Sequence, residues 1–153
     1  MTANITPTRV DVKALVDARE GHADLSGTLV QRSDVLEILK GRVDADLKLE
    51  QVHKHIPSVD TLSGRIRLQA KASGPVDKLT TEGSATINQL RFNQHKVAQA
   101  NADWKLDFNP GSPLGRASIE AQDVSVADNK VEKVQLQFAP QGSGGHLSLA
   151  VKK

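Results

Sequence analysis

Residues 62–72, Leu-Ser-Gly-Arg-Ile-Arg-Leu-Gln-Ala-Lys-Ala, alternate small or aliphatic side chains with polar ones. Successive side chains of a β-strand point to opposite faces of the sheet, so this alternation predicts a strand with one apolar and one polar face. The same period of two returns in residues 100–108, 134–138 and 147–151. The sequence therefore predicts long one-sided strands, whose apolar face needs something to cover it.

The composition limits what can cover that face. The chain has 153 residues, the length of one domain, and 38% of them are apolar. The aromatic residues are only Phe92, Trp104, Phe108 and Phe138. A β-sandwich usually fills its core with bulky rings, so their scarcity favours a smooth aliphatic surface over a packed sandwich core.

The charges and the missing cysteines exclude several classes of protein. The net charge is +2, and the charged residues are spread along polar strand positions. Without a basic stripe or an aromatic platform, we expect no nucleic-acid partner. The absence of cysteine excludes disulfides and thiolate zinc sites. No apolar run approaches the roughly 20 residues of a membrane span, and no signal peptide is visible, so we expect neither in this sequence.

The alternation and the turn residues together predict eleven strands. Proline and glycine in residues 73–75, 109–113 and 140–145 are expected to end strands, because proline cannot donate a ladder hydrogen bond. Residues 93–96 and 128–130 are expected to form hairpin turns. The expected strands are residues 9–18, 22–30, 42–49, 63–72, 80–89, 90–93, 97–108, 116–121, 124–126, 131–138 and 146–151.

Two segments break the period of two. Leu49, Val52 and Ile56 have the spacing of an amphipathic helix and Pro57 follows them, which predicts a short helix over residues 49–56. Residues 34–37 fit either a helical turn or a strand, and the sequence leaves both open.

A weak internal repeat relates two parts of the chain that are 34 residues apart. In each copy a strand is followed by a short strand, a turn and a long strand, as in proteins built from stacked units. We therefore expect one domain, residues 1–153, with units at about 62–93, 97–126 and 131–151. The matching positions are Leu90 and Val124, Phe92 and Val126, Lys96 and Lys130, Val97 and Val131, and Trp104 and Phe138.

No set of residues indicates catalysis or metal binding. His53 and His55, two positions apart on the expected helix, point about 200° away from each other and cannot share one ion. Asp44 and Asp46 share a strand face, but a solvated face does not shift carboxyl pKa values into a catalytic range. Neither a G-x-S-x-G elbow nor a phosphate loop is present. We expect no enzyme activity, no cofactor and no metal.

The run LSGRIRLQAKASGPVDKLTTEGSATINQLRF, residues 62–92, carries a resemblance to a known family. An L-x-G start, an alternating strand, an S-G-P turn, a second alternating strand and a short L-x-F strand follow in order. This order is similar to the recurring unit of the TamB and AsmA-like family, and Ile56-Pro57 resembles the helical turn that precedes such a unit. The resemblance is best over residues 42–138. The chain lacks the family's N-terminal membrane helix and is far shorter, which is expected of a fragment.

The resemblance implies an all-β fold in which a long twisted sheet forms an open trough, or β-taco, with an aliphatic interior. It implies a segment of a periplasmic, inner-membrane-anchored protein that shields acyl chains during phospholipid transport to the outer membrane. The implied partners are phospholipid acyl chains, the rest of the parent chain and an Omp85-type outer-membrane protein similar to TamA, with a linked role in outer-membrane protein assembly.

The residues expected to line the trough are the apolar members of the alternating strands, with Trp104 as a structural plug. Two other functions stay open: a chaperone-like scaffold that binds nascent outer-membrane strands by β-augmentation, and a self-contained β-sandwich or solenoid with dry faces. The expected lining is Ile66, Leu68, Ala70, Ala85, Ile87, Leu90, Phe92, Ala100, Ala102, Trp104, Leu106, Phe108, Ala117, Ile119, Val124, Val126, Val134, Leu136, Phe138, Leu147 and Leu149.

Overall fold

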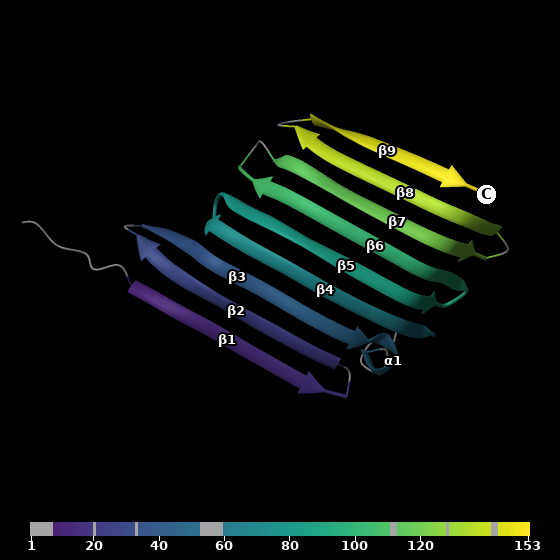
Figure 1. The fold of residues 1–153 in the computed structure, drawn as a ribbon, viewed down its shortest axis with the longest axis horizontal. Coiled ribbons are helices and arrows are strands. Elements are labelled where there is room, and N and C mark those ends of the chain that lie inside the picture. The colour runs from purple at the N-terminus through teal and green to yellow at the C-terminus, as the bar shows by residue number, and fades with distance from the viewer. Residues whose placement is uncertain are drawn as a thin grey trace, which may run out of the picture.

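The computed structural model describes residues 8–19, 21–32, 34–52, 60–110, 113–127, 129–141 and 144–153. Within them, nine antiparallel strands form one open sheet, and each strand pairs with its neighbours in the sequence (Figure 1). The expected all-β fold with one long open sheet is confirmed. The strands are β1 (Thr8–Ala18), β2 (Gly21–Arg32), β3 (Val35–Lys48), β4 (Leu62–Pro75), β5 (Leu79–Phe92), β6 (His95–Phe108), β7 (Leu114–Val126), β8 (Asn129–Gln141) and β9 (Gly144–Lys152).

Several strands are longer than the sequence predicted. Residues 80–92 and 116–126, each expected to belong to two strands, lie in the continuous strands β5 and β7, and Asn93 lies in the turn after β5. The segment that was left open, residues 34–37, lies mostly in β3 and is extended.

Two expected strand ends were wrong, because β4 continues through Pro75 and β8 through Gln141. Each proline pairs on one side only: Pro75 pairs with β3, and Pro140 pairs with Gly145 of β9. The pairing of β8 with β7 omits Pro140. A proline that lacks an N–H is tolerated where one side of the ladder does not need its donor.

The helix α1 (Leu49–Val52) forms one turn at the end of β3. The remainder of the expected helix, with His53 and His55, lies outside the described residues. Leu49 is only 7% exposed, and the Glu50 carboxylate accepts a hydrogen bond from the Gly64 N–H at 3.1 Å. The hydrogen bond therefore fixes the turn to the start of β4, and the turn buries Leu49.

A line of irregular backbone crosses β4, β5 and β7 near one end of the sheet. Gln89 and Asp123 both have positive φ angles, at 52° and 49°, and they are 34 residues apart. In the β4–β5 pairing the register shifts here, so that Gln89 is the extra residue of a β-bulge opposite Gly64. We call Gly64, Gln89 and Asp123 the bulge line. Gln89 and Asp123 lie where the sequence predicted separate strands, but the ladder continues past both of them.

The described residues have almost no closed core. Among the described residues, the buried hydrophobic side chains of Val30, Ala45 and Leu49 are each less than 9% exposed, and Gly64 and Pro140 are also buried. A stable domain usually packs one layer against another, and the described residues form a single layer with one helical turn (Figure 1).

Candidate functional site: an uncovered aliphatic face

The strand register brings apolar residues into three rows that cross all nine strands on one side of the sheet. Residues directly opposite each other in neighbouring strands share a face, so each row follows from successive pairings. The central row is Val16, Ala23, Ala45, Leu68, Ala85, Ala102, Ile119, Leu136 and Leu149. The tryptophan row is Ala14, Leu25, Val43, Ala70, Gly83, Trp104, Ala117, Phe138 and Leu147. The isoleucine row is Ala18, Gly21, Leu47, Ile66, Ile87, Ala100, Ala121, Val134 and Val151.

We call these three rows the aliphatic face. At about 4.8 Å between strands, it extends roughly 38 Å across the sheet. Every member is aliphatic or glycine except Trp104 and Phe138. Rows of this composition form one continuous apolar surface, which is larger than the isolated apolar residues normal on a soluble protein.

Most residues that the sequence proposed as trough lining belong to this face. The central row contains Leu68, Ala85, Ala102, Ile119, Leu136 and Leu149; the tryptophan row contains Ala70, Trp104, Ala117, Phe138 and Leu147; the isoleucine row contains Ile66, Ile87, Ala100 and Val134. Leu106 and Phe108 continue the same side of β6 beyond the tryptophan row.

The other four expected lining residues lie apart from the three rows. Leu90, Phe92, Val124 and Val126 follow the bulge line, where positive φ angles interrupt strict alternation. Leu90 pairs with Val97, and Val124 pairs with both Val97 and Val131, so these four residues form a separate short apolar row. Phe92 and Val126 lie beyond this row, opposite His95 and Asn129.

Sequence reasoning missed the contribution of the first three strands and of Gly83, Ala121 and Val151. A signal was available in β3, where Val43, Ala45 and Leu47 alternate with Arg42, Asp44 and Asp46. Pairing with β4 places Val43, Ala45 and Leu47 beside Ala70, Leu68 and Ile66. The sequence could not show which strand pairs with β3, because strand pairing depends on contacts across the whole chain.

The aliphatic face is exposed over much of its area. Ile119 is 45% exposed, and at the β9 edge Leu149 and Leu147 are 64% and 68% exposed. In the described residues no second layer packs on these side chains. The face is thus open in the described part of the chain.

Trp104 lies across Gly83, its direct partner in the neighbouring strand. A Cβ atom built at Gly83 would overlap the indole ring of Trp104 and would lie 2.6 Å from the Gln69 carbonyl oxygen. The glycine therefore makes room for the ring, which in turn shields backbone that a glycine leaves uncovered. This arrangement fits the expected role of Trp104 as a structural plug.

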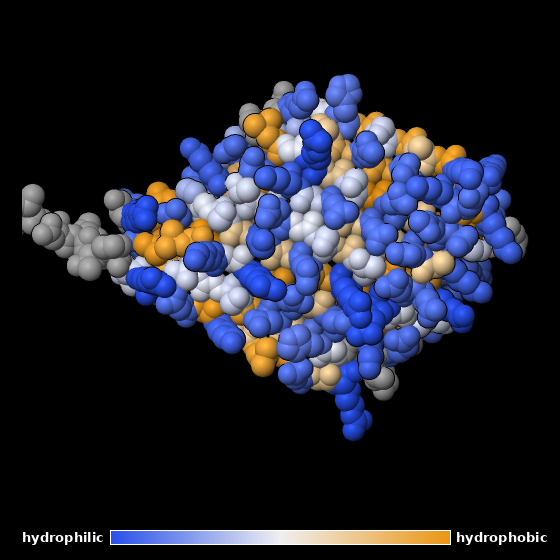
Figure 2. Space-filling model, viewed as in Figure 1, coloured by the Kyte–Doolittle hydropathy of each residue, from blue (hydrophilic) through white to orange (hydrophobic). Residues whose placement is uncertain are grey.

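The opposite face of the sheet is polar, and hydrophilic side chains dominate the face seen in Figure 2. A hollow of about 1160 Å³ is lined mostly by polar-face residues, among them Gln69, Ser84, Asp103, Lys105 and Arg116. Six members of the tryptophan row also border it, among them Trp104 and Phe138, but no residue of the central row does. The hollow therefore lies mostly among polar-face residues along the tryptophan row, and the centre of the aliphatic face is outside it.

Ion pairs across strands tie the polar face together. Asp46 accepts hydrogen bonds from Arg65, which uses two nitrogens at 2.5 and 2.6 Å, and from Arg67 at 3.1 Å. The hydrogen bonds from Arg65 are the main reason why the pKa of Asp46 is lowered. Such a paired carboxylate holds neighbouring strands in register and is not available as a base.

Glu120 is the most strongly held carboxylate of this face. Gln135 donates to it at 2.7 Å, Lys133 lies 3.0 Å away and Gln122 donates at 3.2 Å. These hydrogen bonds, led by the one from Gln135, lower the pKa of Glu120 from 4.5 to about 2.

Replacement Glu120→Gln is expected to reduce stability at pH 7 and to have little effect at pH 2. A carboxylate with a lowered folded-state pKa stabilises the fold above the unfolded value of 4.5, and this contribution is lost as the pH falls toward 2. Urea unfolding of both proteins at pH 7, 4 and 2 measures the difference. A difference that stays constant over this range would contradict the assignment.

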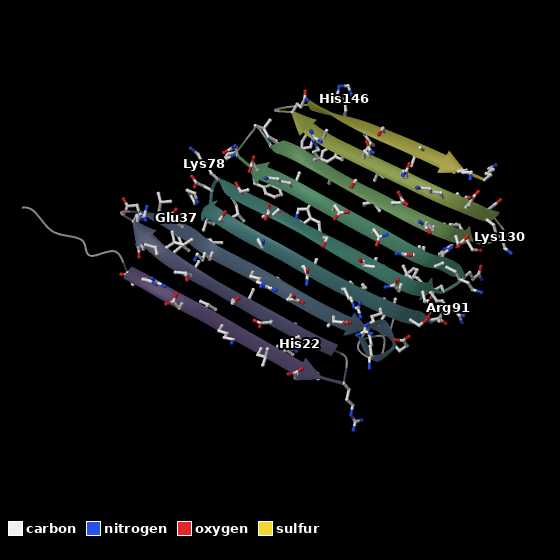
Figure 3. All side chains as sticks on the ribbon, in the orientation of Figure 1. His22, Glu37, Lys78, Arg91, Lys130 and His146 are labelled. Carbon is white, nitrogen blue, oxygen red and sulfur yellow. The ribbon has the colours of Figure 1, made fainter. Side chains whose placement is uncertain are left out.

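The described residues contain no metal-binding cluster. No group of three or more His, Asp or Glu side chains among them has the geometry to hold a metal ion. The labelled histidines His22 and His146 lie far apart on opposite parts of the sheet (Figure 3). Within the same residues, no helix has the length and hydropathy that a membrane span requires.

The fold and the site together define an all-β protein with an open single-layer sheet and one uncovered aliphatic face. Comparisons with protein families, with curated proteins and with solved structures gave no match to this chain.

Proposed function

We propose that this chain is a segment of a periplasmic lipid-transfer protein of the TamB and AsmA-like kind. Its aliphatic face would shield acyl chains while phospholipids move between the inner and outer membranes. The parent protein would be anchored in the inner membrane, would act with an Omp85-type partner and would contribute to outer-membrane protein assembly. The observation that carries the proposal is the aliphatic face itself, three apolar rows across nine strands with no covering layer in the described residues.

The energetic argument concerns the cost of moving a lipid through water. Exposing a chain of 16 carbons costs about 13 kcal/mol at roughly 0.8 kcal/mol per methylene group. A continuous surface of Ala, Val, Leu and Ile removes part of that chain from water without specific contacts, so the lipid can slide along it. The small residues Ala85, Ala100 and Ala102 leave room at the centre of the face.

Replacement Ile119→Arg tests this proposal, because Ile119 lies in the central row and is 45% exposed. A charge at an open face costs little stability, whereas an unpaired charge in a dry core costs several kcal/mol. The readout is quenching of Trp104, the only tryptophan, by phosphatidylcholine with bromine on its acyl chains. We expect the variant to stay folded and to bind this lipid ~tenfold more weakly, a loss of about 1.4 kcal/mol.

The matched control is Ser118→Arg, which adds the same charge at the next residue on the polar face. It should bind the lipid as the unmodified chain does. Equal binding by both variants would show that the aliphatic face is not the lipid site. Unfolding of the Ile119→Arg variant would instead indicate a dry core and favour a closed β-sandwich.

The open edges of the sheet support a second candidate, a scaffold for nascent outer-membrane strands. In the described residues β1 and β9 each pair with one neighbour only, which leaves ladder groups available for β-augmentation. Binding of a peptide strand at an edge should survive Ile119→Arg. Loss of lipid binding with intact peptide binding would therefore separate the two functions.

A further inference from the structure

The middle strand of the sheet divides the aliphatic face into two halves with opposite side-chain sizes. β5 has four strands on each side (Figure 1). In the central row, residues that lie the same number of strands from β5, one on each side, form pairs of one small and one large side chain. Three such pairs are Leu68 and Ala102, Ala45 and Ile119, and Ala23 and Leu136.

The same relation holds in the tryptophan row and the isoleucine row. The three rows contain twelve such pairs, and ten of them join an alanine or glycine with a larger side chain. The two exceptions are Val16 with Leu149 and Leu25 with Phe138. Further examples of the matched pairs are Ala70 and Trp104, Val43 and Ala117, and Leu47 and Ala121.

We propose that a second copy of the chain covers the aliphatic face when no lipid is bound. A two-fold axis parallel to β5, halfway between two stacked sheets, reverses the strand order and keeps the position along the strands. Each row then lies on the same row of the second copy, with large side chains opposite small ones, as a well-packed symmetric interface requires. The inference concerns the lipid-free state of this face and does not depend on the proposed function.

A two-fold axis across the strands would give a poorer fit. It would place each strand opposite itself, so that Leu68 would face Leu68 of the second copy and Ala102 would face Ala102. Pairs of leucines would overlap while pairs of alanines would leave gaps, and both defects destabilise a packed interior. The side-chain sizes therefore favour the axis parallel to β5.

The aliphatic face is large enough for a stable dimer. It extends roughly 38 Å across the sheet and roughly 20 Å along the strands, about 760 Å² per copy. A typical specific interface buries about 800 Å² per partner. The three rows contain no charged residue, so the dimer would dehydrate no charge within them. Two copies would also supply the two packed layers that a single sheet lacks.

Trp104 fits the place on the axis where two glycines meet. Gly83 of β5 would face Gly83 of the second copy, and the Trp104 ring lies over Gly83 in its own sheet. The rings of the two copies would therefore meet at the axis. Two stacked rings between the backbones match the separation of about 10 Å between packed sheets.

Leu68→Ala and Ala102→Leu test the pairing in the strands next to β5, where the angle of about 30° between packed sheets displaces facing residues least. Each single change should weaken the dimer ~tenfold in sedimentation velocity of the lipid-free full chain, because the first leaves a gap and the second crowds Leu68. The combined variant exchanges the two sizes and should dimerise within ~threefold of the unmodified chain. The matched control Asn101→Leu adds a leucine on the polar face and should not change the dimer.

Three results would overturn the inference: a monomer up to ~0.1 mM without lipid, a combined variant as weak as the single ones, or an equal loss in the polar-face control. Short-chain phosphatidylcholine below its micelle concentration separates the inference from the proposed function. Dissociation of the dimer by this lipid supports both. A dimer that the lipid leaves intact supports the inference and contradicts the proposed function. A monomer whose Trp104 is quenched by brominated phosphatidylcholine overturns the inference and leaves the proposed function standing.

Discussion

Replacement Gly115→Ala is expected to lower the free energy of unfolding by about 2–3 kcal/mol, a large effect for a single methyl group. Gly115 has a φ of 133°, a conformation that is almost restricted to glycine. A Cβ atom there would also overlap the backbone carbonyl of Lys105 in the neighbouring strand. The new methyl group can be accommodated only if β6 and β7 move apart.

Gly144→Ala is the matched control for this prediction. A Cβ atom at Gly144 would meet no heavy atom nearer than the Gln141 oxygen at 4.0 Å, and the φ angle is not in the left-handed region. Its effect should stay within about 0.5 kcal/mol. Urea unfolding with linear extrapolation compares the two. Equal stabilities of the two variants would show that the backbone at Gly115 is not constrained as described.

Replacement Gly83→Val is expected to destabilise the sheet by about 1–3 kcal/mol, the usual cost of overpacking. The added side chain would occupy the space of the Trp104 indole and crowd the Gln69 carbonyl. The ring must then leave its position on the tryptophan row, and its fluorescence emission should shift to longer wavelength. Trp104 is the only tryptophan, so this signal has a single source.

A double-mutant cycle with Trp104→Ala separates the two contributions to the destabilisation by Gly83→Val, that of the indole ring and that of the neighbouring backbone. If the ring is the main obstacle, Gly83→Val should cost at least about 1 kcal/mol less in the Trp104→Ala background. The contact with the Gln69 carbonyl remains in both backgrounds and is removed by the comparison. Additive effects would mean that the indole does not lie over Gly83 in solution.

The two glycines also show which local features could be predicted from the sequence. A glycine within an alternating strand signals a bulge or a close approach, and both Gly83 and Gly115 lie in such strands. Which of these two reasons applies depends on the neighbouring strand. Gly83 is needed because Trp104 is its partner in β6, whereas Gly115 is needed both for its own φ angle and for the close approach of the Lys105 carbonyl.

Turn residues gave a less reliable signal than alternation. Pro75 and Pro140 were expected to end strands, but both belong to strands. Each proline pairs with a residue of only one neighbouring strand. The sequence shows that a proline lacks a donor, but not whether the neighbouring strand needs that donor. Similarly, Gln89 and Asp123 have positive φ angles where the sequence predicted breaks, while the ladder continues past them.

The candidate site was predictable in its chemistry but not in its extent. Alternation identified fifteen of the residues that lie on the aliphatic face, from Ile66 to Leu149. Alternation did not show that β1 to β3 contribute to this face. A period of two shows which residues of one strand share a side, but not which side of the neighbouring strand they join.

The sequence by itself determined that this protein is built from long one-sided strands, because side-chain direction in a strand alternates whatever the partner. It also determined the aliphatic character of one face, since Ala, Val, Leu and Ile occupy the alternate positions. Only the tertiary structure decided the order and register of the nine strands, and hence that the apolar positions join into rows with no covering layer in the described residues. Pairing energy arises between strands, so the strand order and register were not determined by any single stretch of sequence.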